Sequence, residues 1–354
     1  MQAKSKSILS ILIGIIVVSA LVSYIVLFKN KVFDNSTSNK QSLSPSPSTT
    51  NIKNEKIRFG MGKTTQATLI VIANEMKFFE KEGLDIEIKE YDSGKPAFDD
   101  MLLDKVDYSA PGHAIVAEAS LNRSDFKVLT SIASSNNFFK ILTRKDKNIV
   151  IGRDLKGKKV GVTKESYSPK YLKMFLDANA INENEVEKVF ADINTSTNQL
   201  LNGEIDALVA GEPYASIAAE KLGQNALLLS QPGLFTVFNV LAARDDVLNV
   251  NPQNAEKILR ALIKASDYLY LNKDAAHQIV AKHYNLDIKQ LDILTKDFDY
   301  NLSLNQNLLL SMENDLNWSV SFEGNTQANF PNFLNILYEK PLKNLLPNNV
   351  DIIR

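Results

Sequence analysis

The chain has 354 residues, of which 44% are hydrophobic and 23% are charged, and it contains no cysteine. This length exceeds that of one small domain and predicts two domains or lobes with a substantial core. The lack of cysteine excludes disulfide bonds, thiolate metal sites, a cysteine nucleophile and the lipid anchor of bacterial lipoproteins. A net charge of −1 argues against a nucleic-acid-binding protein.

An uncharged, apolar run of 21 residues, 8–28, lies near the start of the sequence. As a helix it is long enough to cross a hydrocarbon core of about 30 Å. We expect residues 1–30 to be a retained signal-anchor, because the run continues beyond the small residues Val18, Ser19 and Ala20 that fit a cleavage site. Cleavage stays open as the alternative, and a buried core helix is less favoured. The rest of the protein would then lie outside the cytoplasm, in the periplasm or the extracellular space.

Residues 31–54 follow as an expected flexible linker. They are rich in Ser, Thr, Asn and Pro and have few apolar side chains, so they cannot bury enough surface to fold. Residues 1–54 carry six lysines and one aspartate, which leaves the remainder of the chain with a net charge of −6. This mildly acidic balance does not identify a partner.

Strand and helix patterns alternate from residue 55 onward. The first series predicts strands at 56–61, 84–88, 106–110, 126–133 and 138–143, and helices at 65–82, from Pro96, and at 114–121. Gly83 stands where a glycine commonly ends a helix. The repetition predicts a largely parallel sheet with helices on both faces.

The pattern then restarts. The second series predicts strands at 158–162, 186–191, 207–210, 226–229 and 236–243, and helices at 169–178, 196–202 and 213–222. Helices at 253–271, 274–284, 288–297 and 305–320 complete the chain. The fold class is therefore α/β, in two parts with a helical C-terminal section. Ligands of such sheets bind beyond the carboxyl ends of the strands, which makes the loops after the strands the candidate site.

Motif searches exclude several kinds of site. Residues 60–64 (GMGKT) are not a phosphate-binding P-loop, because Ile57 stands where that motif requires glycine. Thr64 and Thr65 can instead hold a small polar ligand, or simply cap the following helix. The spacing of the three histidines does not suggest a metal site; His113, after a predicted strand, either touches a ligand or lies on the surface. Dinucleotide-binding and hydrolase motifs are absent, and no cofactor is expected.

Glu212, Pro213 and Tyr214 follow the predicted strand 207–210. A carboxylate near a helix N-terminus is stabilising by about 0.3–1 kcal/mol, which alone would explain Glu212. In a cleft, Glu212 can also pair with an ammonium group or ring nitrogen of a ligand, and Tyr214 can stack on the same ligand.

Four stretches, in this order and spacing, carry a family resemblance. They are KIRFGMGKTTQATLIVIANEMKFFEKEGLDIEI (56–88), VDYSAPGHAIVAEA (106–119), DLKGKKVGVTKES (154–166) and GEIDALVAGEPYAS (203–216). With them the chain from residue 55 to its end resembles the ABC-transporter substrate-binding proteins of the nitrate, sulfonate and taurine group. These proteins share their fold with thiamine-pyrimidine-binding proteins.

The resemblance implies a two-lobed periplasmic-binding-protein fold of the second type. Lobe 1 would comprise residues 55–143 and 237–354 and lobe 2 residues 144–236, with hinge crossings near Thr143 and Val237. The implied function is capture of a small polar solute between closing lobes and its delivery to an ABC permease in the membrane. A monomer with no metal, cofactor or nucleic-acid partner is expected.

Carried over loop by loop, the resemblance also implies the ligand-binding residues. They are Thr64, Thr65, Ser93, Gly112, His113, Asn136, Glu165, Ser166, Asn194, Thr195, Glu212 and Tyr214, with Pro111 and Asn137 beside them. Glu165 and Glu212 favour a ligand with a positive or donor group, such as an aminosulfonate or an aminopyrimidine, over nitrate.

Two alternatives to transport remain. One is an enzyme of the thiamine-pyrimidine synthase type on the same fold, which the lack of cysteine disfavours because those enzymes use a cysteine-rich motif. The other is a ligand-binding module that serves a sensor, which the sequence does not separate from a transport component.

Overall fold

The computed structural model describes residues 56–163, 166–322 and 330–353 of the chain. These belong to one compact unit, residues 54–354. The expected anchor and linker, residues 1–54, lie outside the described ranges. Within those ranges, no helix combines the length and apolar character needed to span a bilayer.

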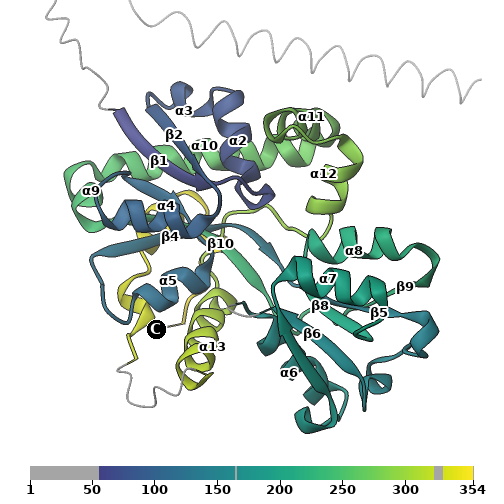
Figure 1. Ribbon diagram of the computed structural model, residues 1–354. Helices are drawn as coiled ribbons and strands as arrows, with labels where there is room; N and C mark the ends of the chain where they lie inside the picture. Colours follow the sequence, from purple (N-terminus) through teal and green to yellow (C-terminus); the bar gives the residue numbers. More distant parts are fainter. Residues whose placement is uncertain (1–55, 164–165, 323–329, 354) are drawn as a thin grey trace, which may run out of the picture. The chain divides into compact units, whose positions relative to one another are not determined.

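The first of two sheets has the strand order β2-β1-β3-β10-β4 (Figure 1). Its strands are β1 (Lys56–Gly62), β2 (Asp85–Tyr91), β3 (Tyr108–Ala110), β4 (Phe126–Ser135) and β10 (Val237–Arg244). β1 is parallel to β2 and β3, whereas β10 is antiparallel to both of its neighbours. The sheet is therefore largely parallel, as predicted.

The second sheet repeats this plan with the order β7-β6-β8-β5-β9. Its strands are β5 (Phe139–Arg144), β6 (Lys159–Thr163), β7 (Glu187–Ala191), β8 (Ala207–Gly211) and β9 (Ala226–Leu229). Here β5 is the strand that runs against its neighbours. The α/β class with two sheets is thus confirmed.

The chain changes sheets between Ser135 and Phe139, and returns before Val237. The first change comes earlier in the chain than the expected crossing near Thr143. Thr143 pairs with Ala207 and Leu227, so it lies inside the second sheet. The strand at 138–143 is where the periodicity places it, but pairing partners distant in sequence decide its sheet.

Most of the helices agree with the predicted pattern. They are α2 (Thr68–Glu75), α3 (Phe78–Lys81), α4 (Gly94–Leu102), α5 (His113–Ala119), α6 (Ser168–Ala178), α7 (Ile193–Asn202), α8 (Tyr214–Leu222), α9 (Asp245–Val250), α10 (Pro252–Leu271), α11 (Lys273–Tyr284), α12 (Ile288–Thr295), α13 (Gln306–Phe322) and α14 (Glu339–Leu345). The expected helix 65–82 is interrupted, because Lys77 adopts a left-handed conformation with φ of 58°. The sequence pattern did not predict α9 and α14.

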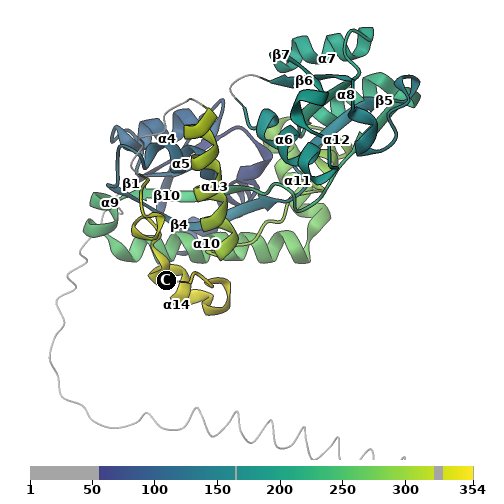
Figure 2. The same cartoon turned by 90° about the horizontal axis from the view of Figure 1, so that it is seen from below.

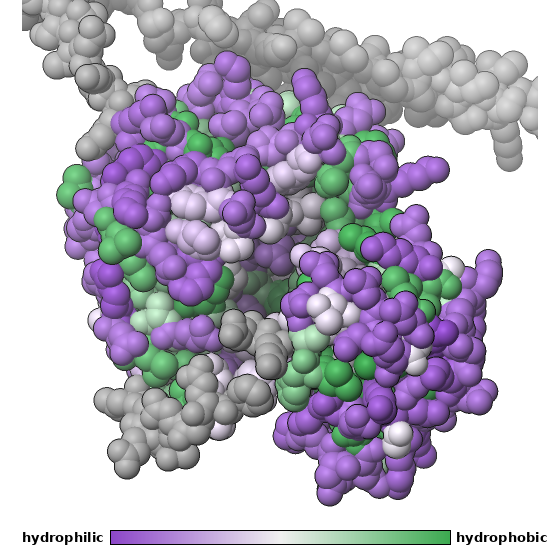
Figure 3. All heavy atoms as spheres, viewed as in Figure 1, coloured by the Kyte–Doolittle hydropathy of each residue, from purple (hydrophilic) through white to green (hydrophobic). Residues whose placement is uncertain are grey.

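Each sheet has its own apolar core. In the first, Phe59 and Tyr108 stack with ring centroids 6.2 Å apart. In the second, separate clusters around Tyr171 and around Leu200 pack on the sheet. Figure 2 shows α10 on one side of the first sheet and α4 and α5 on the other. The face in Figure 3 is mostly hydrophilic, as expected when apolar side chains fill these cores.

Candidate functional site

Three loops meet at the carboxyl edge of the first sheet, because β1, β2 and β3 run in the same direction. Gly62 allows the contact between the first two loops: a Cβ there would lie 2.7 Å from the carbonyl carbon of Ser93. A Cβ on Gly94 would lie 3.1 Å from Pro111 Cα. The loops that carry Thr64, Ser93 and Gly112 are therefore packed backbone to backbone.

Two half-buried tyrosines from the C-terminal helical section hold the loop after β1. The Tyr284 hydroxyl donates to the carbonyl oxygen of Thr64 over 2.8 Å, and that of Tyr300 donates to Thr65 over 2.9 Å. Burial raises the pKa of both tyrosines, so both stay protonated and keep these hydrogen bonds. Thr64 stands at the N-cap position but its side chain makes no cap hydrogen bond.

His113 begins α5 and is buried, so the alternative of a surface histidine is wrong. Its Nδ1 accepts a hydrogen bond from the backbone N–H of Phe238 over 3.2 Å. The ring proton is therefore at Nε2 in the neutral form. Nε2 lies 3.0 Å from Asp315 Oδ2, which is ion-pair distance, although the angles of a hydrogen bond are not met.

Asn239 is a polar residue of this edge that the sequence analysis did not select. It lies on β10, opposite Gly112, and is buried. Its Nδ2 donates to Gln66 Oε1 and to the carbonyl oxygen of Ala110, both over 3.3 Å. Oδ1 has no hydrogen-bond partner among the described residues. An asparagine within the apolar segment 237–243 was the signal that could have identified it.

The second sheet presents a matching edge, where β6, β7 and β8 end. Ser166 follows β6, and its hydroxyl donates to the carbonyl oxygen of Thr163 over 2.9 Å. Asn194 and Thr195 follow β7, and their backbone N–H groups donate to Asp192 Oδ1 over 2.9 and 3.0 Å. Both residues thus take part in capping α7 and are exposed. Glu165 lies outside the described residues.

Glu212 follows β8 and is buried with a counter-ion. Its Oε1 accepts from Lys140 Nζ over 2.5 Å and from the Ser216 hydroxyl over 2.9 Å. Lys140 also donates to Asp297 Oδ2 over 2.6 Å. Glu212 thus already has a cationic partner in Lys140, which the sequence analysis did not predict. Tyr214, at the start of α8, is 48% exposed.

Asn136 and Asn137 lie where the chain first changes sheets. Asn136 is exposed, and its carbonyl oxygen accepts from the backbone N–H of Gly233 over 2.8 Å. The contact ties the two connections between the sheets together. Asn137 Nδ2 donates to Asp297 Oδ1 over 3.2 Å.

A second buried lysine, Lys170 on α6, was also missed. Its Nζ donates to Asp315 Oδ1 over 2.6 Å and to the carbonyl oxygen of Asn314 over 2.9 Å. Lys140 and Lys170 are both paired with carboxylates. Each lies on a regular element and not on a loop, so a search confined to loops could not find it.

A cavity of about 550 Å³ lies beside Lys170, between α6 and α13. Its lining is Lys170, Met174, Leu234, Phe235, Thr236, Ser311, Asn314, Asp315, Asn317, Trp318 and Ser321. Aromatic and aliphatic side chains thus stand beside a buried ion pair. The volume is in the range of small-molecule sites.

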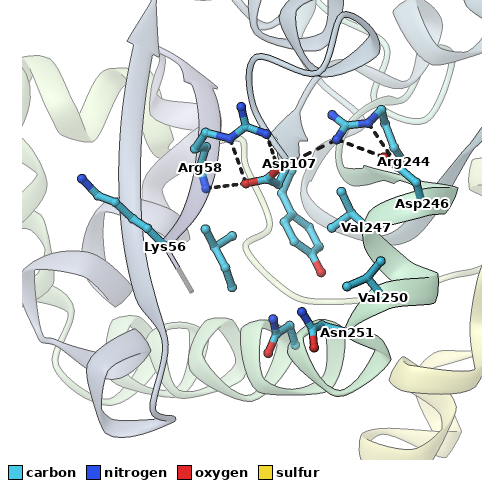
Figure 4. A pocket seen from close by; sticks show the side chains of 11 residues that line it. Lys56, Arg58, Asp107, Arg244, Asp246, Val247, Val250 and Asn251 are labelled. Carbon is cyan, nitrogen blue, oxygen red and sulfur yellow. Dashed lines mark hydrogen bonds and ion pairs between the residues drawn. The ribbon is translucent and has the colours of Figure 1, made fainter. Parts of the chain in front are cut away.

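Another cavity, of about 340 Å³, lies at the opposite edge of the first sheet. Figure 4 shows Arg58 and Arg244 on either side of Asp107 there. Arg58 Nη2 donates to Asp107 over 2.6 Å, and this hydrogen bond raises the pKa of Arg58. These arginines are engaged with carboxylates of the fold. Among the described residues there is no cluster of three or more His, Cys, Asp or Glu side chains that could hold a metal ion.

Sequence comparisons find a matching family and several similar proteins. Residues 64–276 match the family described as "NMT1/THI5 like". A Bacillus subtilis protein named "Putative aliphatic sulfonates-binding protein" is 27% identical over 253 residues, which cover 69% of this chain and 74% of that protein. A Haemophilus influenzae protein named "Putative thiamine biosynthesis protein" is 28% identical over 220 residues, covering 59% of this chain and 67% of that protein.

Solved structures share the fold. The periplasmic aliphatic sulphonate binding protein SsuA from Escherichia coli superposes with a TM-score of 0.66 at 16% identity, over 77% of this chain and 94% of SsuA. The desulfurization enzyme DSZB superposes with a TM-score of 0.60 at 13% identity, over 83% of this chain and 99% of DSZB. At such identities the likeness concerns the fold alone. The family match covers more than half of the chain, and the protein therefore belongs to the NMT1/THI5-like family.

Proposed function

We propose that this protein is the extracytoplasmic solute-binding component of an ABC importer. Lobe 1 is the part built on the first sheet and lobe 2 the part built on the second. The observation that carries the proposal is the repeated sheet plan, in which each sheet offers polar loops at its carboxyl edge. Ligands of open α/β sheets bind at such edges. The solute would be held between the lobes, which close on it and open to release it to a permease.

The solute we propose is a small polar molecule with an oxyanion group, such as a sulfonate, or an aminopyrimidine. Names of similar proteins that refer to aliphatic sulfonates and thiamine biosynthesis support these classes. Because Glu212 already pairs with Lys140, the choice of solute does not rest on this carboxylate. Hydroxyl groups of Thr64 and Thr65 can donate hydrogen bonds to an oxyanion.

The binding set we propose is the one expected from the sequence, without reliance on the Glu212 charge. The lobe 1 residues Thr64, Thr65, Ser93, Gly112 and His113 share one sheet edge. Ser166, Asn194, Thr195 and Tyr214 follow the corresponding strands of lobe 2, and Asn136 lies at the crossing. Asn239 joins the proposed set because its buried Oδ1 lacks a hydrogen-bond partner among the described residues and can accept one from a solute.

A thermal-shift panel on the full chain in detergent tests the proposal, with an alkanesulfonate, taurine, bicarbonate, nitrate and an aminopyrimidine as probes. Binding raises the melting temperature in a concentration-dependent way. Thr65→Val should reduce that shift. Thr295→Val is the matched control, because the Thr295 hydroxyl donates to Leu291 within α12 and its loss should lower stability without changing the shift. Stabilisation by no probe, together with no copurified small molecule in native mass spectrometry, would refute solute binding.

We also propose that residues 8–28 anchor the protein in the membrane with both lobes outside the cytoplasm. The supporting observation is the length of this uncharged apolar run. Mass spectrometry of purified membranes should find the intact N-terminal peptide. A mature chain that begins near Leu21 would refute retention.

A sensor that uses the same site is the alternative to transport. Copurification of this protein with a permease and its ATPase from crosslinked membranes would support transport. Crosslinking to a signalling receptor with no permease present would support the alternative.

A further inference from the structure

Two lysines of lobe 2 reach carboxylates of lobe 1. Lys140 lies on β5 and donates to Asp297 Oδ2 over 2.6 Å. Lys170 lies on α6 and donates to Asp315 Oδ1 over 2.6 Å. Asp297 follows α12 and Asp315 lies on α13, two helices with residues in the core of the first sheet. Both ion pairs therefore cross from one lobe to the other.

These ion pairs are withdrawn from water. The side chains of Lys170 and Asp315 are 8% and 3% exposed, and those of Lys140 and Asp297 are 6% and 21% exposed. A buried charge is tolerated when its counter-ion is present, and removal of one partner leaves the other uncompensated. Loss of one charged partner therefore destabilises the arrangement in which the lobes are together, because the remaining charge is then buried away from water.

In each of the two ion pairs that cross between the lobes, one member also has a second charged or titratable partner within its own lobe. Lys140 also pairs with Glu212 of lobe 2 over 2.5 Å. Asp315 also lies 3.0 Å from His113 Nε2 of lobe 1. If the lobes separate, Lys140 keeps Glu212 and Asp315 keeps His113. Only the crossing contacts break, and Asp297 and Lys170 can then be hydrated.

Aromatic contacts accompany the pair on α6. The Tyr167 ring lies 6.0 Å from the Trp318 ring of α13, and the Tyr167 hydroxyl donates to Glu118 Oε1 of α5 over 3.4 Å. Lys170 Nζ lies 5.9 Å from the centre of the Tyr167 ring. The start of α6 thus meets lobe 1 through an ion pair and a ring contact.

We propose that Lys140–Asp297 and Lys170–Asp315 form an interlobe latch, which favours the closed arrangement of the lobes before a solute binds. The latch rests on the proposed function, because it regulates the same site. A solute shifts the lobes toward closure only by its differential affinity for the closed state. A latch that already favours closure therefore increases the apparent affinity for the solute.

Distance measurements between spin labels test the latch in the full chain without solute. Because the chain has no cysteine, Lys95→Cys on α4 and Lys221→Cys on α8 give two exposed labelling sites, one in each lobe. Lys170→Met and Asp315→Asn should each add a population at a changed distance. Lys173→Met is the control, since Lys173 forms an exposed pair with Asp177 on the same helix and should leave the distance unchanged. Unchanged distances in both latch variants would overturn the proposal.

A double variant separates loss of the ion pair from the effect of an uncompensated charge. Lys170→Met with Asp315→Leu removes both charges and therefore the ion pair, so the added population should persist although no unpaired charge remains. A double variant that returns to the distance of the unaltered protein would show that an uncompensated charge, and not loss of the ion pair, opened the single variants, and would overturn the latch. For a probe that binds, Lys170→Met should weaken affinity about tenfold if the closed fraction falls by that factor. The distances are measured without solute, so failure of the solute panel would not alter the latch result.

Discussion

Gly62→Ala tests whether the close packing of loops builds the lobe 1 edge. The added Cβ would lie 2.7 Å from the Ser93 carbonyl carbon and 2.8 Å from the Gly94 nitrogen. An ordinary contact is at least 3.4 Å, so the loops must separate by about 0.6–0.7 Å. The colliding atoms are backbone and cannot rotate away. Added volume in a well-packed region costs about 1–3 kcal/mol, and we expect a loss of stability in this range.

Gly112→Ala is the matched control at the same edge. Its Cβ would find its nearest neighbours at 3.9 and 4.0 Å, and Gly112 has φ of −67° and ψ of 145°, which alanine adopts readily. We expect a stability change within about 0.5 kcal/mol, because the reduced entropy of the unfolded chain opposes the poorer N-cap residue. Urea unfolding followed by circular dichroism measures both variants. If Gly62→Ala is as stable as Gly112→Ala, the loops are not held by this contact.

Three further predictions concern buried and half-buried groups. Burial raises the pKa of Tyr171 to about 12 and also raises that of Tyr284, so these tyrosines ionise at lower pH in the unfolded chain than in the folded protein. The free energy of unfolding should therefore keep its full value below about pH 10 and fall as the pH rises toward 12. Urea unfolding across that pH range measures this. A flat profile would contradict this. Trp318, the single tryptophan, lines the cavity between α6 and α13. A bound probe that closes the lobes should therefore shift the tryptophan fluorescence emission. Trp318→Phe should abolish this fluorescence change and keep the thermal shift. Lys140→Met leaves Glu212 and a second carboxylate without their cation and should cost about 3–5 kcal/mol in urea unfolding; a cost no larger than that of Lys173→Met would refute the buried pairing.

The sequence by itself determined the α/β class and most of the regular elements. Apolar periodicity is a local property, so it placed strands such as β1 and β8 and the helices α10 and α13 nearly to their observed ends. It also identified the loops after the strands, because parallel strands end at a common edge. A helix–helix break such as the one at Lys77 carries no comparable local signal.

Only the tertiary structure decided which charges are available at the site. Glu212 and Lys140 are 72 residues apart, and Lys170 and Asp315 are 145 apart, so no local pattern links them. Strand pairing likewise assigned β5 to the second sheet. These features arise from contacts between distant segments, and burial then fixes which side chains neutralise one another. The sequence therefore determined where a solute would be sought, and the fold decided which residues remain free to meet it.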